Sequence, residues 1–394
     1  MKLPTRSARA DLLTQLRNEK MARSAHAYVR GSTVQFYEWL HSQRGRRLPH
    51  GPAVWICGDC HAGNLGPTGD LKGRIDMQIR DLDQSVIGNP VHDLVRLALS
   101  LATAARGSDL PGVTTARMLE EMMRGYQQAF RHRPGEELER PPQVASGMRA
   151  AVKRTWKHLA RERIDNARPT IPQGKSFWPL ARDEKSAIAT LCATPALHRL
   201  VTSLKGRPDD AQVQLLDAAY WVKGCSSLGL LRYAVLLGVG DEKEQDYCLI
   251  DVKQAVAAAA PRAPRASMPR DNAKRVVEGA RHLSPSLGDR MQATRFLEQG
   301  VFIRELLPQD MKLDIDNLSQ ADAMAAAAYL AQVVGRAHAR QMDAATRKSW
   351  LAELQLNRSD NLQAPSWLWT SVVQLVGSHE QGYLEHCRRW ALGR

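Results

Sequence analysis

The order of its segments restricts the fold of this chain most strongly, because a strand-like middle separates two helical regions. Apolar residues recur at helical spacing before residue 170 and again after residue 319. Short apolar runs separated by glycine-containing turns, typical of an antiparallel meander, occupy residues 217–223, 230–237 and 247–253. This order predicts an α+β protein in which a small antiparallel β unit interrupts a mainly helical chain.

The length of 394 residues allows more than one core, so we expect the chain to divide into parts. Residues 1–200 and 319–394 would together form the helical part. Residues 201–318 would form the β-rich part. Within it, residues 255–269 are rich in alanine and proline, which indicates a flexible connection.

Composition limits the surroundings and partners of the protein. The net charge of +14 favours polyanions such as nucleotides, nucleic acid or acidic head groups, although no nucleic-acid-binding motif accompanies it. A basic face exposed to water is the simpler explanation. No apolar run approaches the roughly 20 residues that span a bilayer. No secretory signal is recognisable, so we expect a cytoplasmic protein without a membrane partner.

One loop carries the residues that most strongly suggest chemistry. It follows a predicted strand and reads Gly-Asp-Cys-His-Ala-Gly-Asn over residues 58–64. Asp59 could accept the proton of a hydroxyl group that attacks a phosphoryl group. The oxygens of Asn64, Asp81 and Asp83 are the hard ligands that Mg²⁺ prefers. The pattern therefore predicts phosphoryl transfer from ATP to a hydroxyl, although Asp and Asn also stabilise ordinary turns.

A second group of residues, in the β-rich part, could hold the nucleotide. Backbone N–H groups in a turn of small residues can approach phosphates closely, and Lys253 on a later strand could neutralise them. Glu278, in a predicted helix, would hold Lys253 in place. The strand predicted at 301–305 could bind adenine through its backbone, and Arg304 could contact phosphates or substrate. The turn residues expected at the phosphates are Gly224, Ser226, Ser227 and Gly229.

The loop at 58–64 resembles the catalytic loop of aminoglycoside and choline phosphotransferases, which are relatives of the protein kinases. Asp81 resembles their metal-binding Asp, and Asp93 resembles an Asp that ties down the following helix. The resemblance implies a two-lobed, protein-kinase-like fold that uses ATP and Mg²⁺. The acceptor would be a small molecule or a protein side chain. Cys57 departs from the pattern, because related enzymes often have His there.

The order of these parts is reversed relative to familiar kinases, where the nucleotide-binding lobe precedes the catalytic loop. Residues 328–340 resemble the helix that normally leads into that loop, yet they lie near the end of this chain. A circular permutation would explain the order, since folds tolerate new termini when the old ones can be joined.

A closer resemblance covers nearly the whole chain, to an uncharacterised bacterial family, the domain of unknown function 2252. It supports the expected fold and site more than any substrate. The segments that carry it are 20–21, 28–31, the loop with Asp59, 81–83, the Gly224 turn, 252–253, 275–279 and 337–340.

Two other interpretations remain open. Residues 57–61 fit Cys-x-x-Cys-His, a haem attachment pattern, and Cys57 and Cys60 could instead be a redox pair or half of a zinc site. The chain could also be a kinase-like module that binds nucleotide or nucleic acid without catalysis. A pure binding module would not need all four of the retained residues, so an enzyme is favoured; they are Asp59, Asn64, Asp81 and Lys253.

Overall fold

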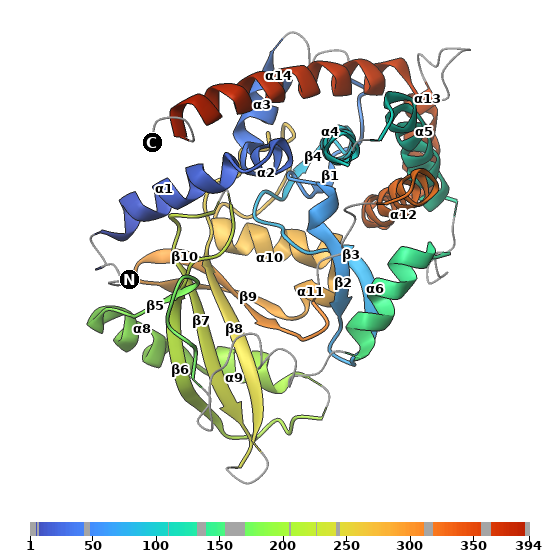
Figure 1. Ribbon diagram of the computed structural model, residues 1–394. Helices are drawn as coiled ribbons and strands as arrows, with labels where there is room; N and C mark the ends of the chain where they lie inside the picture. Colours follow the sequence, from blue (N-terminus) through green and yellow to red (C-terminus); the bar gives the residue numbers. More distant parts are fainter. Residues whose placement is uncertain are drawn as a thin grey trace.

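The chain is an α+β protein with antiparallel sheets (Figure 1). Ser226 lies outside the described residues. The computed structural model describes residues 5, 8–42, 48–108, 110–131, 139–153, 170–204, 206–225, 227–241, 245–310, 318–355 and 364–390.

The main sheet contains every strand that the described residues place between 177 and 306, and its pairings are all antiparallel. The predicted meander is confirmed, and β8 places Lys253 opposite Arg232 on one side and Phe302 on the other. In spatial order the strands are β5 (Phe177–Trp178), β6 (Val213–Trp221), β7 (Arg232–Val239), β8 (Asp246–Gln254), β10 (Gln299–Leu306) and β9 (Met291–Phe296).

The two faces of the main sheet have different environments, because successive side chains of a strand point to opposite faces. Ile250 and Val252 pack into a core with α8 (Arg182–Cys192), α9 (Pro195–Thr202) and Leu13 of α1 (Arg9–Met21). Asp251 and Lys253 alternate with them and face the opposite way. Helix α8 and most of α9 fall within residues 1–200, which we expected to form the helical part, yet they pack with the main sheet.

The helical region has its own larger core, built mainly around α4 (Val91–Gly107), α5 (Gly112–Ala129) and α12 (Gln320–Ala339). Helices α5 and α12 approach closely at Gly125, where any side chain would overlap the backbone of Ala328. The remaining helices of this region are α2 (Ala25–Gly31), α3 (Thr33–His41), α6 (Pro142–Lys153), α13 (Ala344–Gln355) and α14 (Ser366–Trp390).

Helix α10 (Asn272–Leu283) joins the two regions, since it contacts β9 and β10 of the main sheet and also β1 (Val54–Ile56). The short helix α11 (Pro285–Gly288) follows it. The connection at 255–269 is not free: Ala263 N–H donates to Ile87 O (2.8 Å) and Ala259 N–H to the Gln84 side chain (2.7 Å). The expectation of a flexible link is therefore wrong.

Two small two-stranded sheets position the candidate loops between α10 and the helices (Figure 1). Strand β1 pairs with β4 (Val86–Gly88), and β2 (Leu65–Gly69) pairs with β3 (Ile75–Ile79). The loop after β1, which ends in the short helix η2 (Ala62–Asn64), therefore lies beside the loop between β3 and β4. Within the described part of the chain, no helix is long and apolar enough to cross a lipid bilayer.

Candidate active site

A buried carboxylate holds the start of the loop at 57–64. Asp93, in the first turn of α4, accepts hydrogen bonds from the backbone N–H groups of Cys57 (2.7 Å) and Gly58 (2.9 Å). His338, near the end of α12, contacts the same carboxylate at 3.1 Å. The loop, α4 and α12 are thus tied together, although these residues are far apart in the sequence.

Gly58 allows the chain to turn sharply into the loop. Its φ of +76° lies in the left-handed region, and a Cβ there would overlap the carbonyl oxygen of Gln84. Its own carbonyl accepts a hydrogen bond from the Tyr37 hydroxyl (2.6 Å). The turn presents the next residue, Asp59, to the cleft.

Asp59 is paired with a residue that the sequence interpretation missed. Arg96 of α4, which is fully buried, donates to one Asp59 oxygen through Nε (3.0 Å), and its Nη2 lies 2.9 Å from the same oxygen. Burial raises the pKa of Asp59, and the positive charge of Arg96 opposes that rise without cancelling it. The available signal was an arginine inside an otherwise apolar stretch of predicted helix.

Asn64 joins the two candidate loops. Its side-chain N–H₂ group donates to the backbone carbonyl of Asp81 (2.8 Å) and lies 3.4 Å from the carbonyl of Asp59. The side chain is almost fully buried. The donating nitrogen is fixed on this side, so the amide oxygen is the atom left for a ligand.

Lys253 reaches across the cleft to the second acidic loop. Its ammonium group contacts Asp83 directly and lies 3.5 Å from Asp81. Burial and the charge of Asp81 raise the pKa of Asp83 to about 6. Burial would also raise the pKa of Asp81, but Lys253, a hydrogen bond with Asp83 and the nearby arginines together outweigh it and hold that pKa below its usual range. Water also screens Asp81, whose side chain is 58% exposed.

The predicted partner of Lys253 is wrong. Glu278 of α10 contacts Arg281 (3.5 Å) and His282 (3.7 Å), one turn further along its own helix. The ion pairs of Lys253 run to Asp81 and Asp83 instead. The sequence predicts a carboxylate on the next helix, but in the structure that carboxylate pairs within its own helix.

The glycine-containing turn between β6 and β7 lies at the edge of the same cleft. Gly224 has a φ of +111°, and its carbonyl accepts a hydrogen bond from Lys20 of α1 (2.6 Å). Ser227 also lines the cleft. Gly229 has a φ of +105° but is not among the lining residues.

Arg304 faces the cleft but is already bonded. It donates to Asp251 (3.2 Å) and to the carbonyl of Arg80 (3.0 Å). Arg232 also binds Asp251, in a bidentate ion pair with distances of 2.9 and 2.6 Å. Residues 301–304 of β10 are paired on both sides, with β8 and β9, so their backbone is not free to bind adenine. Glu305 and Leu306 are paired with β8 alone, so the expectation for 301–305 is wrong for all but its last residue.

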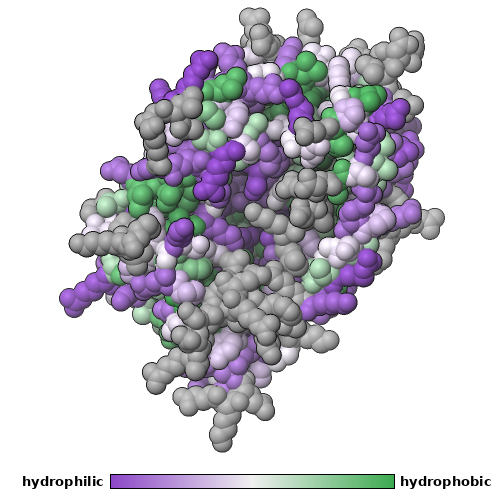
Figure 2. Space-filling view, in the orientation of Figure 1, coloured by the Kyte–Doolittle hydropathy of each residue, from purple (hydrophilic) through white to green (hydrophobic). Residues whose placement is uncertain are grey.

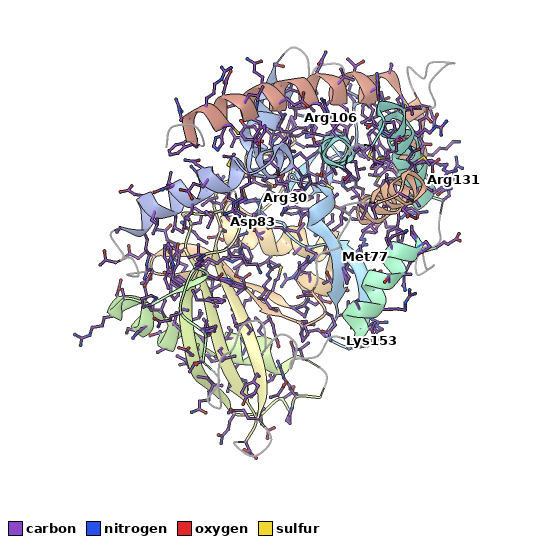
Figure 3. All side chains as sticks on the ribbon, viewed as in Figure 1. Arg30, Met77, Asp83, Arg106, Arg131 and Lys153 are labelled. Atoms are coloured by element: carbon purple, nitrogen blue, oxygen red, sulfur yellow. The ribbon has the colours of Figure 1, made fainter. Side chains whose placement is uncertain are left out.

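A pocket of about 230 Å³ is lined by several of the predicted site residues, but Lys253 and Asp83 are not among them. Those that line it are Asp59, Asn64, Asp81, Gly224, Ser227 and Arg304. Figure 2 shows hydrophilic residues gathered in a hollow near the middle of this face, and Figure 3 labels Arg30 and Asp83 between α2 and the main sheet. Among the described residues that line the pocket, the acidic ones are Asp59 and Asp81, and the basic ones are Lys20, Arg30, Arg80, Lys223, Arg232 and Arg304. A larger hollow of about 750 Å³ lies along α2 and α3 and contains none of the predicted site residues.

The oxygen ligands present fit a magnesium ion. One oxygen of Asp83 is buried and has no hydrogen-bond partner in the described part of the chain, and Lys253 already places a cation between Asp81 and Asp83. Magnesium typically takes one or two protein carboxylates and completes its shell with phosphate and water. Cys57 and Cys60 are fully buried in the core, and the described residues contain no cluster of three or more histidine, cysteine or acidic groups.

Comparison with known proteins gives a family but no characterised relative. No curated protein and no solved structure matches this chain. One family model, described as an uncharacterized protein conserved in bacteria, matches residues 9–389. That span includes every residue of the cleft. The chain therefore belongs to the DUF2252 family, as its sequence motifs suggested.

Proposed function

We propose that the protein is a Mg²⁺- and ATP-dependent phosphotransferase that acts on a hydroxyl acceptor. One observation carries the proposal: Lys253, from the main sheet, lies 3.5 Å from Asp81, which lines the same cleft as Asp59. Lys253 and Asp81 are 172 positions apart in the sequence, and phosphoryl transfer requires such residues to lie together.

Each residue has a role that its position supports. Asp59 accepts the proton of the acceptor hydroxyl, and the buried Arg96 holds the carboxylate in one orientation. Asp81, Asp83 and the Asn64 amide oxygen would hold the metal, which would offset the charge of the phosphates when bound. Lys253 would then turn from the carboxylates to the phosphates, beside the backbone of the Gly224 turn.

The arrangement of the elements supports a circularly permuted, two-lobed, kinase-like fold. The side chain of Gln341, just after α12, makes hydrogen bonds with both the N–H (2.8 Å) and the carbonyl (3.0 Å) of Trp55 in β1. The end of α12 therefore adjoins the strand that leads into the loop of Asp59. A permuted chain needs this juxtaposition, since those two segments would be continuous in the unpermuted order.

Two variants separate binding from chemistry. We expect Asp81→Asn to weaken Mg²⁺-dependent ATP binding about tenfold or more, measured by calorimetry with and without EDTA. Asp59→Asn should retain binding and lose at least about a hundredfold in ATP turnover. Asp70→Asn, at the exposed turn between β2 and β3, is the matched control. Unchanged binding and turnover in both cleft variants would contradict the proposal.

A non-catalytic role is the second candidate. The lining of the cleft is mainly basic, which favours binding of a nucleotide or another polyanion even without turnover. This alternative predicts that ATP binds but is never consumed, and that Asp59→Asn changes nothing measurable. A phosphorylated product that requires Asp59 would exclude it.

A further inference from the structure

The basic residues at the two ends of the cleft differ in their bonding partners. We call the end with Arg232 and Arg304 the sheet end, and the end with Lys20 and Arg30 the helix end. At the sheet end, Arg232 and Arg304 both donate to Asp251, which is fully buried. At the helix end, Lys20 bonds only to a neutral carbonyl, that of Gly224. Within the described part of the chain, no ion pair involves Lys20 or Arg30. Positive charge at the helix end is thus uncompensated.

Unused donors gather at that end. Arg30 of α2 and the ring of His61 both lie against Gly63, since a Cβ added there would meet each of them at 3.5 Å. Arg30 Nε and His61 Nδ1 are buried, and among the described residues neither has a hydrogen-bond partner. Arg96 Nη1 is in the same situation, and its residue is fully buried beside Asp59.

Buried donors without partners are costly, so their concentration at one place points to a ligand that satisfies them. A guanidinium group matches the geometry of a phosphate or a carboxylate. The sheet end, where Lys253 lies beside Asp81, is where the proposed function puts the metal-bound phosphates of ATP. The Gly224 turn lies between the two ends, since its carbonyl accepts a hydrogen bond from Lys20. The helix end is therefore left for the acceptor.

We propose that the acceptor carries an anionic group, a phosphate or a carboxylate, which binds Arg30 and Lys20 at the helix end of the cleft. The inference rests on the proposed function and adds a substrate class to it. The acceptor oxygen forms the new P–O bond as the bond between the γ-phosphorus and ADP breaks. Asp59 takes the hydroxyl proton, so the step is balanced.

The test uses inorganic phosphate as the probe, titrated calorimetrically into the full chain with and without saturating Mg²⁺ and a non-hydrolysable ATP analogue. We expect phosphate to bind in addition to the nucleotide. Arg30→Gln should weaken phosphate about tenfold, as expected for loss of a charge-assisted contact, and should affect phosphate more than nucleotide. Lys20→Met is a second variant, and Arg30→Lys should restore part of the affinity. Arg117→Gln, at an exposed position of α5, is the matched control.

The outcomes separate the two proposals. If phosphate competes with the bound analogue, or binds alike in the wild type and in both cleft variants, the inference is overturned while the proposed function stands. If the analogue fails to bind in the presence of Mg²⁺, the proposed function fails and the inference with it. Additive binding that depends on Arg30 and Lys20 supports both.

Discussion

The loop at 57–64 has polar groups on both of its sides, and the two sides are built differently. Behind it, Asp93 is fully buried and bonded to two backbone N–H groups and to His338. His338 in turn contacts the Tyr126 hydroxyl (3.0 Å). In front, the Asp81 side chain is 58% exposed and shares one ammonium group with Asp83.

This difference indicates that the buried side of the loop stabilises the fold, whereas the exposed side is available for binding and chemistry. A buried, fully bonded carboxylate fixes the loop, and its removal would leave several buried partners unsatisfied. A carboxylate that faces a cleft contributes little to folding but stays available to a ligand. We therefore expect variants behind the loop to unfold the protein and variants in front of it to change binding only.

The largest effect is expected from Asp93→Ala. The substitution leaves the N–H groups of Cys57 and Gly58 and the ring of His338 without their acceptor. We expect the free energy of unfolding to fall by about 4 kcal/mol in urea denaturation. Asp209→Ala, at an exposed position, is the control. A decrease in the free energy of unfolding as small as that of the control would contradict the proposed difference between the two sides of the loop.

Gly58→Ala should come next, with a loss of about 3 kcal/mol. Alanine is strained at a φ of +76°, and its Cβ would also overlap the carbonyl of Gln84. Gly73→Ala isolates the first effect, because Gly73 has a φ of +77° and nothing within 4 Å of an added Cβ. If the free energy of unfolding fell equally in the two variants, the overlap of the added Cβ with the Gln84 carbonyl would contribute nothing to the loss.

Glu305, another buried carboxylate, sharpens the comparison because its contribution to stability depends on pH. Burial raises the pKa of Glu305 to about 7, despite its ion pair with Arg207 (2.9 Å). Because the folded pKa exceeds the unfolded value, stability is greatest at low pH and falls as the pH rises. We expect a decrease of about 2 kcal/mol between pH 5 and 7, which Glu305→Gln should remove. If the wild-type protein and Glu305→Gln gave the same denaturation curves throughout this pH range, the prediction would be contradicted.

The smallest effect on stability is expected from Asp81→Asn. Lys253 keeps Asp83 as a partner, and the Asn64 bond runs to the Asp81 backbone, which the substitution preserves. The unfolding free energy should change by less than about 0.5 kcal/mol. A loss comparable to that of Asp93→Ala would mean that the front of the loop is structural as well.

Much of the local structure was predictable from the sequence. The strand predicted at 247–253 is β8, which is longer by one residue at each end, and the helical spacing noted after residue 319 begins with α12. The loop with Asp59 was recognisable because glycine, aspartate and asparagine mark turns, and the chemistry of their oxygens is a property of the residues themselves. The family membership could be inferred for the same reason, since motifs are local.

The partners of these residues were decided only by the tertiary structure. Lys253 bonds to Asp81 and Asp83 rather than to Glu278, and Arg96 bonds to Asp59. Periodicity and turn chemistry describe neighbours along the chain, whereas these pairs depend on how α4, α10 and the main sheet pack. Which acidic residue a buried cation meets is set by the orientation of whole elements, and that orientation follows from the cores between them.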